Sequence, residues 1–217
     1  MSRFLLRSVL LILAAGVLSL PASANTITFD TAGRGALLGS VTEAGFTYSA
    51  FSGSLYVNAY GNPLTNNTME GCYVCGGTYG GVLQIVSATS GTFTFNQLDF
   101  EAYNSGGIGT GTLTVEGYLG ATLVGTDTYT LANTSTYDPS YANWTTELAS
   151  ALAGQTLSSL DIVLPAGFDA SGNAFDVGVD NVVLTPALTP APEPGSLMLL
   201  GSGLIGLAGL IRRRIAA

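Results

Sequence analysis

The sequence predicts an all-β domain, an antiparallel β-sandwich or jelly roll, between an N-terminal signal peptide and a single C-terminal transmembrane helix. Three observations support this fold class. Short segments alternate polar and apolar residues, which gives each segment one buried and one exposed face. Clusters of Gly, Asn and Ser separate these segments as turns. The intervals between segments are too short for the crossover helices that a parallel sheet requires.

Residues 1–24 form the predicted signal peptide. Arg3 and Arg7 supply a positive n-region, and residues 9–20 form a short apolar h-region. Ala22 and Ala24 occupy the small-x-small positions that signal peptidase recognises, so cleavage is expected after Ala24. An uncleaved anchor is the alternative, but this apolar segment is too short to span a bilayer comfortably.

The β-sandwich domain is expected over residues 25–184, in about ten short strands. Two of these strands, 112–118 and 122–131, are expected to pair as a hairpin across Leu119, Gly120 and Ala121. The other expected strands are 26–29, 45–51, 55–60, 82–86, 92–95, 98–103, 157–164 and 175–184.

One segment of the domain does not fit the strand pattern. Trp144, Leu148 and Leu152 follow one another at intervals of four residues, which is a helical spacing. We therefore expect a short helix or turn over residues 144–152, with Gly154 as its C-cap. In the alternative, a strand, Trp144, Thr146 and Leu148 would share one face.

The charge balance excludes several function classes. The chain has no His, and its six basic residues are all arginines. Residues 25–191 carry Arg34 and thirteen carboxylates, a formal charge of −12. Such a surface repels phosphates, so nucleic acid is not an expected partner. Without His or Lys the chain has no catalytic triad, imidazole metal ligand, Schiff-base lysine or P-loop.

Two cysteines, Cys72 and Cys75, lie in a Gly-rich loop between expected strands. A C-x-x-C pair can be redox-active, but no helix follows here to lower the pKa of the first thiol. In an exported protein a local structural disulfide is the favoured interpretation, and an intermolecular bridge is a further alternative.

Acidic loops could hold a structural Ca²⁺ ion, because hard cations take several oxygen ligands. The segment 168–173 carries Asp169 near the last strand. Asp30 ends the first strand and Asp180 lies in the last, so these two side chains would meet if the strands pair. No other cofactor is expected, and the alternative for these residues is a solvated turn.

Aromatic side chains offer a second kind of site. Tyr137, Tyr141 and Trp144 fall within one expected loop, where their rings could stack on a sugar. Aromatic residues in strands more often belong to the core, so ligand binding is predicted only for this loop.

The C-terminus, residues 185–217, carries a second targeting signal. A Pro-rich linker, 185–191, leads to Pro192, Glu193 and Pro194. An apolar segment, 197–211, follows as the expected transmembrane helix, at roughly 22 Å a short one. The arginine cluster closes the chain and would stay cytoplasmic; it comprises Arg212, Arg213 and Arg214.

This arrangement over residues 192–217 resembles the PEP-CTERM sorting signal of exported Gram-negative bacterial proteins. Ala191 precedes the motif, where many members have Val. The resemblance implies transient residence in the inner membrane, processing by an exosortase near Pro192–Glu193–Pro194, and delivery to the cell surface or exopolysaccharide matrix. It also implies that the β-domain is cargo.

Two functions are compatible with the sequence. The favoured one is a non-enzymatic cell-surface or biofilm-matrix protein. The alternative is a carbohydrate-binding module that recognises extracellular polysaccharide. An enzyme would require a mechanism that uses carboxylates alone and is the least favoured.

Overall fold

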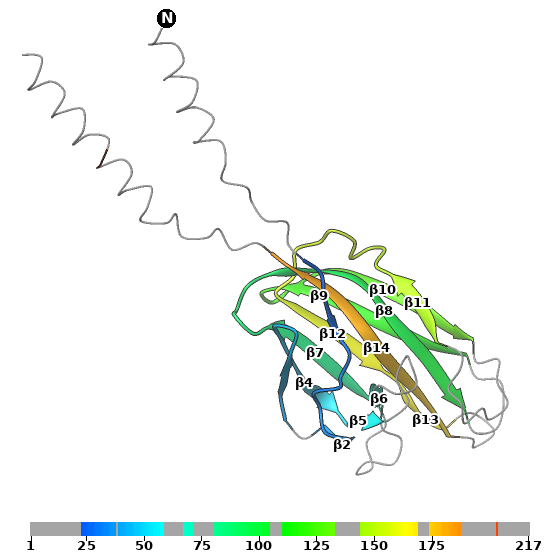
Figure 1. Cartoon of the computed structure of the whole chain (residues 1–217). Coiled ribbons are helices and arrows are strands. Elements are labelled where there is room, and N and C mark those ends of the chain that lie inside the picture. The colour runs from blue at the N-terminus through cyan, green and yellow to red at the C-terminus, as the bar shows by residue number, and fades with distance from the viewer. Residues whose placement is uncertain are drawn as a thin grey trace, which may run out of the picture. The chain divides into compact units, whose positions relative to one another are not determined.

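The structure is a computed structural model that describes residues 23–37, 39–58, 67–71, 80–104, 110–132, 144–168 and 174–187, together with Gly203. Within these residues the domain consists of two antiparallel β-sheets packed face to face (Figure 1). The predicted all-β sandwich is therefore confirmed.

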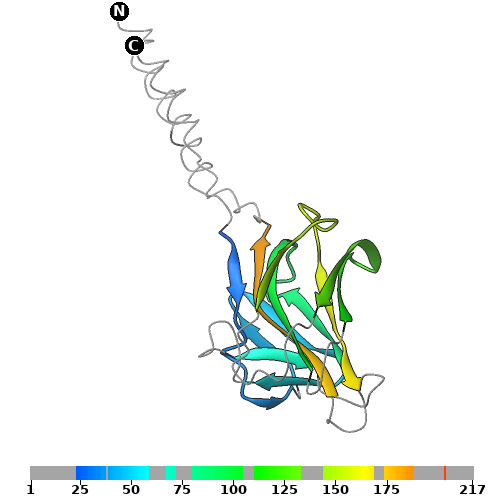
Figure 2. The ribbon, with the colours of Figure 1, turned by 90° about the vertical axis from the view of Figure 1, so that its right-hand side faces the viewer.

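Sheet A is organised around its longest strand, β14. One edge of β14 pairs with β8, and the other edge pairs in succession with β13, β6 and β1. Figure 2 shows β1, in blue, beside the end of β14, in orange. The described strands of this sheet are β11 (Thr145–Leu148), β8 (Phe93–Asn104), β14 (Ala174–Pro186), β6 (Thr68–Gly71), β5 (Leu55–Asn58), β2 (Gly35–Ala36), β1 (Asn25–Ile27) and β13 (Ala166–Phe168).

Sheet B is an uninterrupted antiparallel ladder. Its β9–β10 hairpin turns at Gly120, which has a φ of 62°, a conformation that glycine adopts without a Cβ penalty. The described strands in spatial order are β10 (Thr122–Ala132), β9 (Thr110–Leu119), β12 (Ser159–Leu164), β7 (Gly81–Ser87), β4 (Phe46–Gly53) and β3 (Val41–Glu43).

Each strand expected from the alternation is present in the structure. The segments 92–95 and 98–103 form one strand, β8, whose pairing with β14 shifts register near Gln97. The last strand extends two residues beyond the expected boundary at 184, and Ala187 still donates a hydrogen bond to the Thr92 carbonyl. The linker therefore begins later than residue 185. The alternation did not predict the short strands β2, β3, β6, β11 and β13.

The expected helix or turn at 144–152 is wrong for its first half and correct, as a turn, only for its end. Residues 145–148 form β11, because their backbone groups pair with β8 from Phe100 to Gln97. A turn follows, and Gly154 ends it with a φ of 71°. Leu148 is 65% exposed whereas Leu152 is fully buried, so the helical spacing does not define one apolar face. The strand alternative was the correct one.

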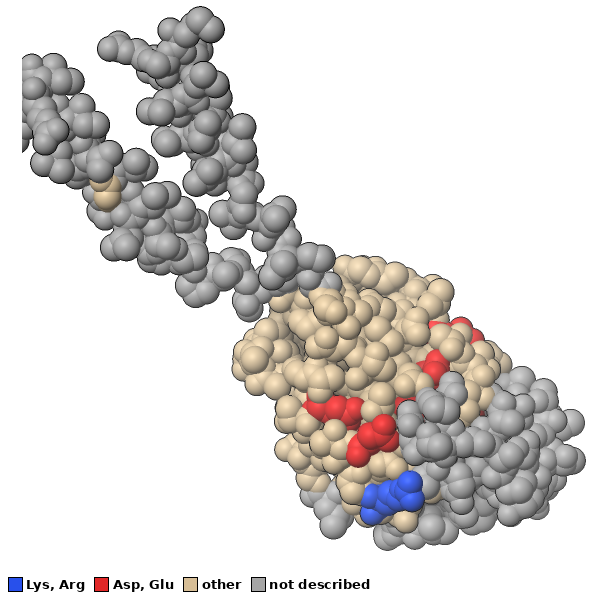
Figure 3. Space-filling view, viewed as in Figure 1, with Lys and Arg blue, Asp and Glu red and all other residues tan. Residues whose placement is uncertain are grey.

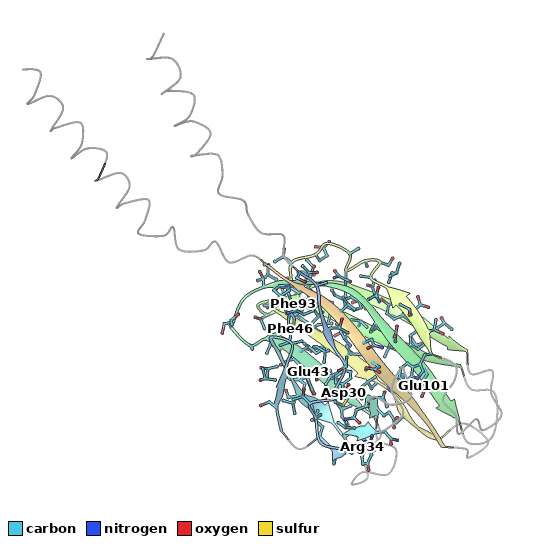
Figure 4. All side chains as sticks on the ribbon, in the orientation of Figure 1. Asp30, Arg34, Glu43, Phe46, Phe93 and Glu101 are labelled. Atoms are coloured by element: carbon cyan, nitrogen blue, oxygen red, sulfur yellow. The ribbon has the colours of Figure 1, made fainter. Side chains whose placement is uncertain are left out.

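The core lies between the two sheets. Phe46 on β4 of sheet B meets Phe93 on β8 of sheet A edge to face, with ring centroids 5.2 Å apart (Figure 4). Phe29 and Tyr48 form a second edge-to-face pair at 5.1 Å. Burying each such ring stabilises the fold by about 2–3 kcal/mol. These contacts join the two sheets.

The chain divides after Ala187 into two units. No helix in the described part of the chain is long and apolar enough to cross a membrane. The predicted transmembrane helix at 197–211 lies outside the described residues except for Gly203, and the predicted signal peptide lies outside them up to Ala22.

Candidate functional site

Two of the predicted ligand residues, Trp144 and Asp180, lie on the outer face of sheet A. Trp144 immediately precedes β11, and its Cη2 atom is 3.6 Å from the position that a Cβ atom on Gly178 would occupy. The indole therefore lies against the bare backbone of β14. Asp180 is two residues further along the same strand, on the same face.

Four carboxylates are buried on this outer face of sheet A, which we call the acidic face. Asp99 on β8 lies directly opposite Asp180 on β14. Glu101 on β8 and Glu70 on β6 lie opposite Gly178 from its two sides. Figure 3 shows acidic side chains across the visible face of the domain, with Arg34 in blue below them.

Neighbouring polar groups bind these carboxylates. Asp99 accepts hydrogen bonds from the Thr146 hydroxyl at 2.6 Å and from the Asn181 amide at 2.9 Å. The backbone N–H of Asn181, which has a φ of 47°, donates to Asp180 at 2.7 Å. These bonds satisfy carboxylate oxygens that would otherwise be buried without a partner.

The predicted Ca²⁺ ligands are only partly brought together. β1 does pair with β14, as the prediction required, but the Asp30 carboxylate accepts hydrogen bonds from the Asn67 backbone N–H and the Thr28 hydroxyl. The described part of the chain contains no group of three or more Asp, Glu, Cys or His side chains arranged to hold a metal ion. Asp169 lies outside the described residues, so the Ca²⁺ site stays a prediction.

Asn67 is a buried residue that the sequence analysis did not single out. Its amide nitrogen donates to the carbonyl groups of Phe29 and Ala32, and its amide oxygen accepts from Arg34 Nε at 3.0 Å. These bonds fix the loop between β1 and β2. Arg34, the one basic side chain among the described residues, is thereby tied to an amide.

The remaining predicted site residues, with one exception, lie outside the described residues. The exception is Ala24, which is exposed and directly precedes β1. The others are Ala22, Cys72, Cys75, Tyr137, Tyr141, Pro192, Glu193, Pro194, Arg212, Arg213 and Arg214.

The outer face of sheet B carries a polar row that the sequence analysis missed. Its members face one another across five neighbouring strands, because each occupies a directly paired position on the next strand. In spatial order the polar row consists of Thr126, Glu116, Asp161, Gln84 and Ser49.

One hydrogen bond joins two members of the polar row, and another joins Glu116 of the row to Tyr118, two residues further along β9. The Gln84 amide donates to Asp161 at 3.0 Å, and the Tyr118 hydroxyl donates to Glu116 at 2.6 Å. Burial raises the pKa of Asp161, the Gln84 bond lowers it in part, and the Glu116 charge raises it further. The bond to Glu116, together with desolvation, raises the pKa of Tyr118 to about 12.

A signal for this row was present in the sequence. Gln84 interrupts the apolar run 82–86, and Asp161 lies between the core residues Leu160 and Ile162. A polar residue at the centre of a buried strand marks the outward direction of its side chain. Only the pairing of the strands, however, shows that these positions form one row.

The C-terminal segment agrees with a known family model. Residues 190–214 match the PEP-CTERM protein-sorting motif. The resemblance inferred from Pro192–Glu193–Pro194 and the arginine cluster is thereby confirmed. The PEP-CTERM motif implies processing by an exosortase and an exported, surface-associated protein.

Solved structures provide distant fold matches. A DUF4465 family protein from Bacteroides caccae is 12% identical, with a TM-score of 0.41 over 80% of this chain and 96% of that one. A family 11 carbohydrate-binding module from Clostridium thermocellum, in complex with a mixed-linked tetrasaccharide, is 15% identical, with a TM-score of 0.32 over 78% and 99%. At these values neither structure assigns a ligand or a residue role here. No curated protein sequence matches the chain.

Proposed function

We propose that the chain is a non-enzymatic protein of the cell surface or exopolysaccharide matrix, with the β-sandwich as cargo delivered by the PEP-CTERM motif. The position of the motif is the observation that supports this most directly. The last strand ends at Pro186, and the match to the motif begins at residue 190. Processing near residue 192 would therefore leave every described strand intact.

The residue inventory supports the non-enzymatic part of the proposal. The chain has no His and no Lys, so no imidazole or amine can act as a general base or as a nucleophile. Two of the buried carboxylates of the acidic face, Asp99 and Asp180, accept hydrogen bonds from Thr146 and Asn181, as expected of groups that stabilise a fold.

The C-terminal mass of the exported protein tests the sorting step in a host that carries an exosortase. We expect the wild-type protein to lack its arginine cluster, and Glu193→Ala to retain it. Ala191→Val is the matched control, since it changes an adjacent residue to one that many members carry, and it should be processed normally. A mature wild-type protein that keeps Arg212–Arg214 would contradict the proposal.

A separate assay tests the absence of catalysis. The purified protein is incubated with soluble polysaccharides, and new reducing ends are measured. We expect none above the buffer control. Release that is lost in Glu116→Gln or Asp161→Asn would show carboxylate-based hydrolysis and would overturn the non-enzymatic assignment.

A further inference from the structure

We infer that the outer face of sheet B binds a neutral polysaccharide chain, laid across the strands along the polar row. This inference rests on the proposed surface location, because only an exported domain meets such a polymer. It differs from the predicted loop site, because Trp144 of that site adjoins β11 of sheet A, whereas the polar row lies on sheet B.

The geometry of the row suits an extended ligand. Neighbouring strands are about 4.8 Å apart, so five strands place polar groups at regular intervals over about 19 Å. The row runs perpendicular to the strands, from Thr126 on β10 to Ser49 on β4. A linear polymer can therefore contact several members of the row at once.

The chemistry of the row suits hydroxyl groups. The Gln84 amide donates a hydrogen bond to Asp161 Oδ1, and the Tyr118 hydroxyl donates one to Glu116 Oε2. Among the described residues, none donates a hydrogen bond to Asp161 Oδ2 or to Glu116 Oε1. These oxygens are acceptors for ligand hydroxyls, and charge-assisted hydrogen bonds of this kind are stronger than neutral ones.

The row also has an apolar end. Tyr118 lies directly opposite Leu123 in the β9–β10 hairpin, so both side chains project from the outer face. Leu123 is 48% exposed, and the Tyr118 ring is held in place by its hydroxyl bond to Glu116. A fixed phenol beside an exposed leucine offers a surface on which the C–H face of a sugar can pack.

Burial of Asp161 distinguishes this face from an ordinary solvated one. The side chain is 7% exposed although it points away from the core, because Gln84 and Glu116 flank it closely. Holding a carboxylate in such a place costs stability, and groups of this kind cluster at functional sites.

Charge selects the class of polymer. The row carries two carboxylates, and no Arg lies on this face within the described residues. Anionic polysaccharides, nucleic acids and anionic lipids are repelled by such a face. Among polysaccharides, this charge therefore favours a neutral, hydroxyl-rich chain over an anionic one.

Affinity electrophoresis of the full chain in detergent tests the inference. The probes are a soluble β-glucan, a galactomannan and a dextran as neutral polymers, and alginate as an anionic one. We expect at least one neutral polymer to retard the protein, and alginate to have no effect. Tyr118→Ala should weaken binding about tenfold and Gln84→Ala several-fold. Tyr56→Ala, which removes an exposed tyrosine from sheet A, should bind like the wild type.

Thermal melting shows which variants are folded. If Tyr118→Ala does not fold, the binding of Gln84→Ala tests the inference in its place. The inference is overturned if no neutral polymer binds, if only alginate binds, or if folded variants of the row bind normally. Loss of binding in Trp144→Ala with normal binding in Tyr118→Ala would place the ligand on sheet A and would also overturn it. The C-terminal mass of the same preparations reports the sorting step separately.

Discussion

The Asp127 carboxylate accepts a hydrogen bond from the backbone nitrogen of Ala151 at 2.6 Å. The backbone nitrogens of Ser150 and Leu152 also donate to it, at 2.9 and 3.4 Å. Asp127 lies on β10, the edge strand of sheet B, and the three donors belong to the turn that follows β11 of sheet A. The Asp127 side chain therefore joins sheet B to the turn that follows β11, and this turn covers part of the β10 edge.

Asp127→Ala should be among the most destabilising substitutions in the domain. It removes a buried carboxylate and leaves three backbone donors without their acceptor, of which only that of Leu152 belongs to a buried residue, at a cost of about 3 kcal/mol. For a domain of this size the melting temperature should fall by about 6–12 °C. Thr128→Ala, at the exposed neighbouring position, should change stability by less than about 0.5 kcal/mol. Equal melting temperatures for the two variants would show that the turn is not held by Asp127.

Comparing Gly53→Ala with Gly120→Ala separates two costs of replacing a glycine: the strain of a positive φ and the steric overlap of the new Cβ. Both residues have positive φ, 71° and 62°, which costs an alanine about 1 kcal/mol. A Cβ at Gly120 would meet nothing within 4 Å. A Cβ at Gly53 would lie 2.7 Å from Gly81 Cα and closer still to the Gly80 carbonyl oxygen. We therefore expect Gly120→Ala to cost about 1 kcal/mol and Gly53→Ala about 3 kcal/mol.

Chemical denaturation with a common m-value measures this difference. The excess cost of Gly53→Ala reports the close approach of β4 to the start of β7, because the φ penalty is shared. If both variants lost the same stability, the backbone contact would be relieved by a small shift.

Alternation predicted the long strands because their burial follows it residue by residue. In β7, Leu83 and Ile85 are buried while Gln84 is not, as period two requires. Short strands carry too few residues to show a period. β6 is the clearest case, since all four of its residues are buried on both faces of the sheet. The alternation of polar and apolar residues therefore locates the long strands, and it misses the short strands that form only through pairing with neighbours.

The same limit applies to the sites. The sequence could place Trp144 and Asp180 on surface positions, but the bare backbone of Gly178 that receives the indole appears only when β11 and β14 join one sheet. The polar row depends on register across five strands, which no single segment encodes. The sorting motif was predictable because its proline, apolar and arginine parts are contiguous.

Asp161→Asn should raise stability at neutral pH. The pKa of Asp161 is raised above its ordinary value of 3.8, mainly by burial, so the charged form is less favourable in the folded state than in the unfolded state. The carboxylate therefore costs stability at pH 7, and this cost is removed as the pH falls through the folded pKa. An asparagine oxygen can still accept the Gln84 bond without the charge.

The melting temperature of Asp161→Asn should exceed that of the wild type at pH 7. The difference should shrink as the pH falls through the folded pKa of Asp161, and it should be lost only well below pH 3.8, where Asp161 is protonated in both states. Glu116→Gln should reduce the difference at pH 7, because the Glu116 charge contributes to the shift. An asparagine variant that is less stable at pH 7 would contradict this account.

Gly178→Ala should displace the single tryptophan of the chain. A Cβ at this position would lie 3.0 Å from the Thr68 hydroxyl oxygen, which is fully buried and donates to the Val179 carbonyl. It would also lie 3.6 Å from Trp144 Cη2. The contact with the indole is an ordinary one, whereas the contact with Thr68 is too tight. Because Thr68 has little room to move, the new methyl group has to shift away from it and toward the indole, and the domain should lose about 1 kcal/mol.

Fluorescence measures this displacement directly, since Trp144 is the only tryptophan. We expect a red-shifted emission maximum in Gly178→Ala, because an indole in greater contact with water emits at longer wavelength. Gly91→Ala, where a Cβ makes only ordinary contacts at 3.6 Å or more, should leave both emission and stability unchanged. Unchanged emission in Gly178→Ala would contradict the expected displacement and would mean that the new methyl group fits between Thr68 and the indole.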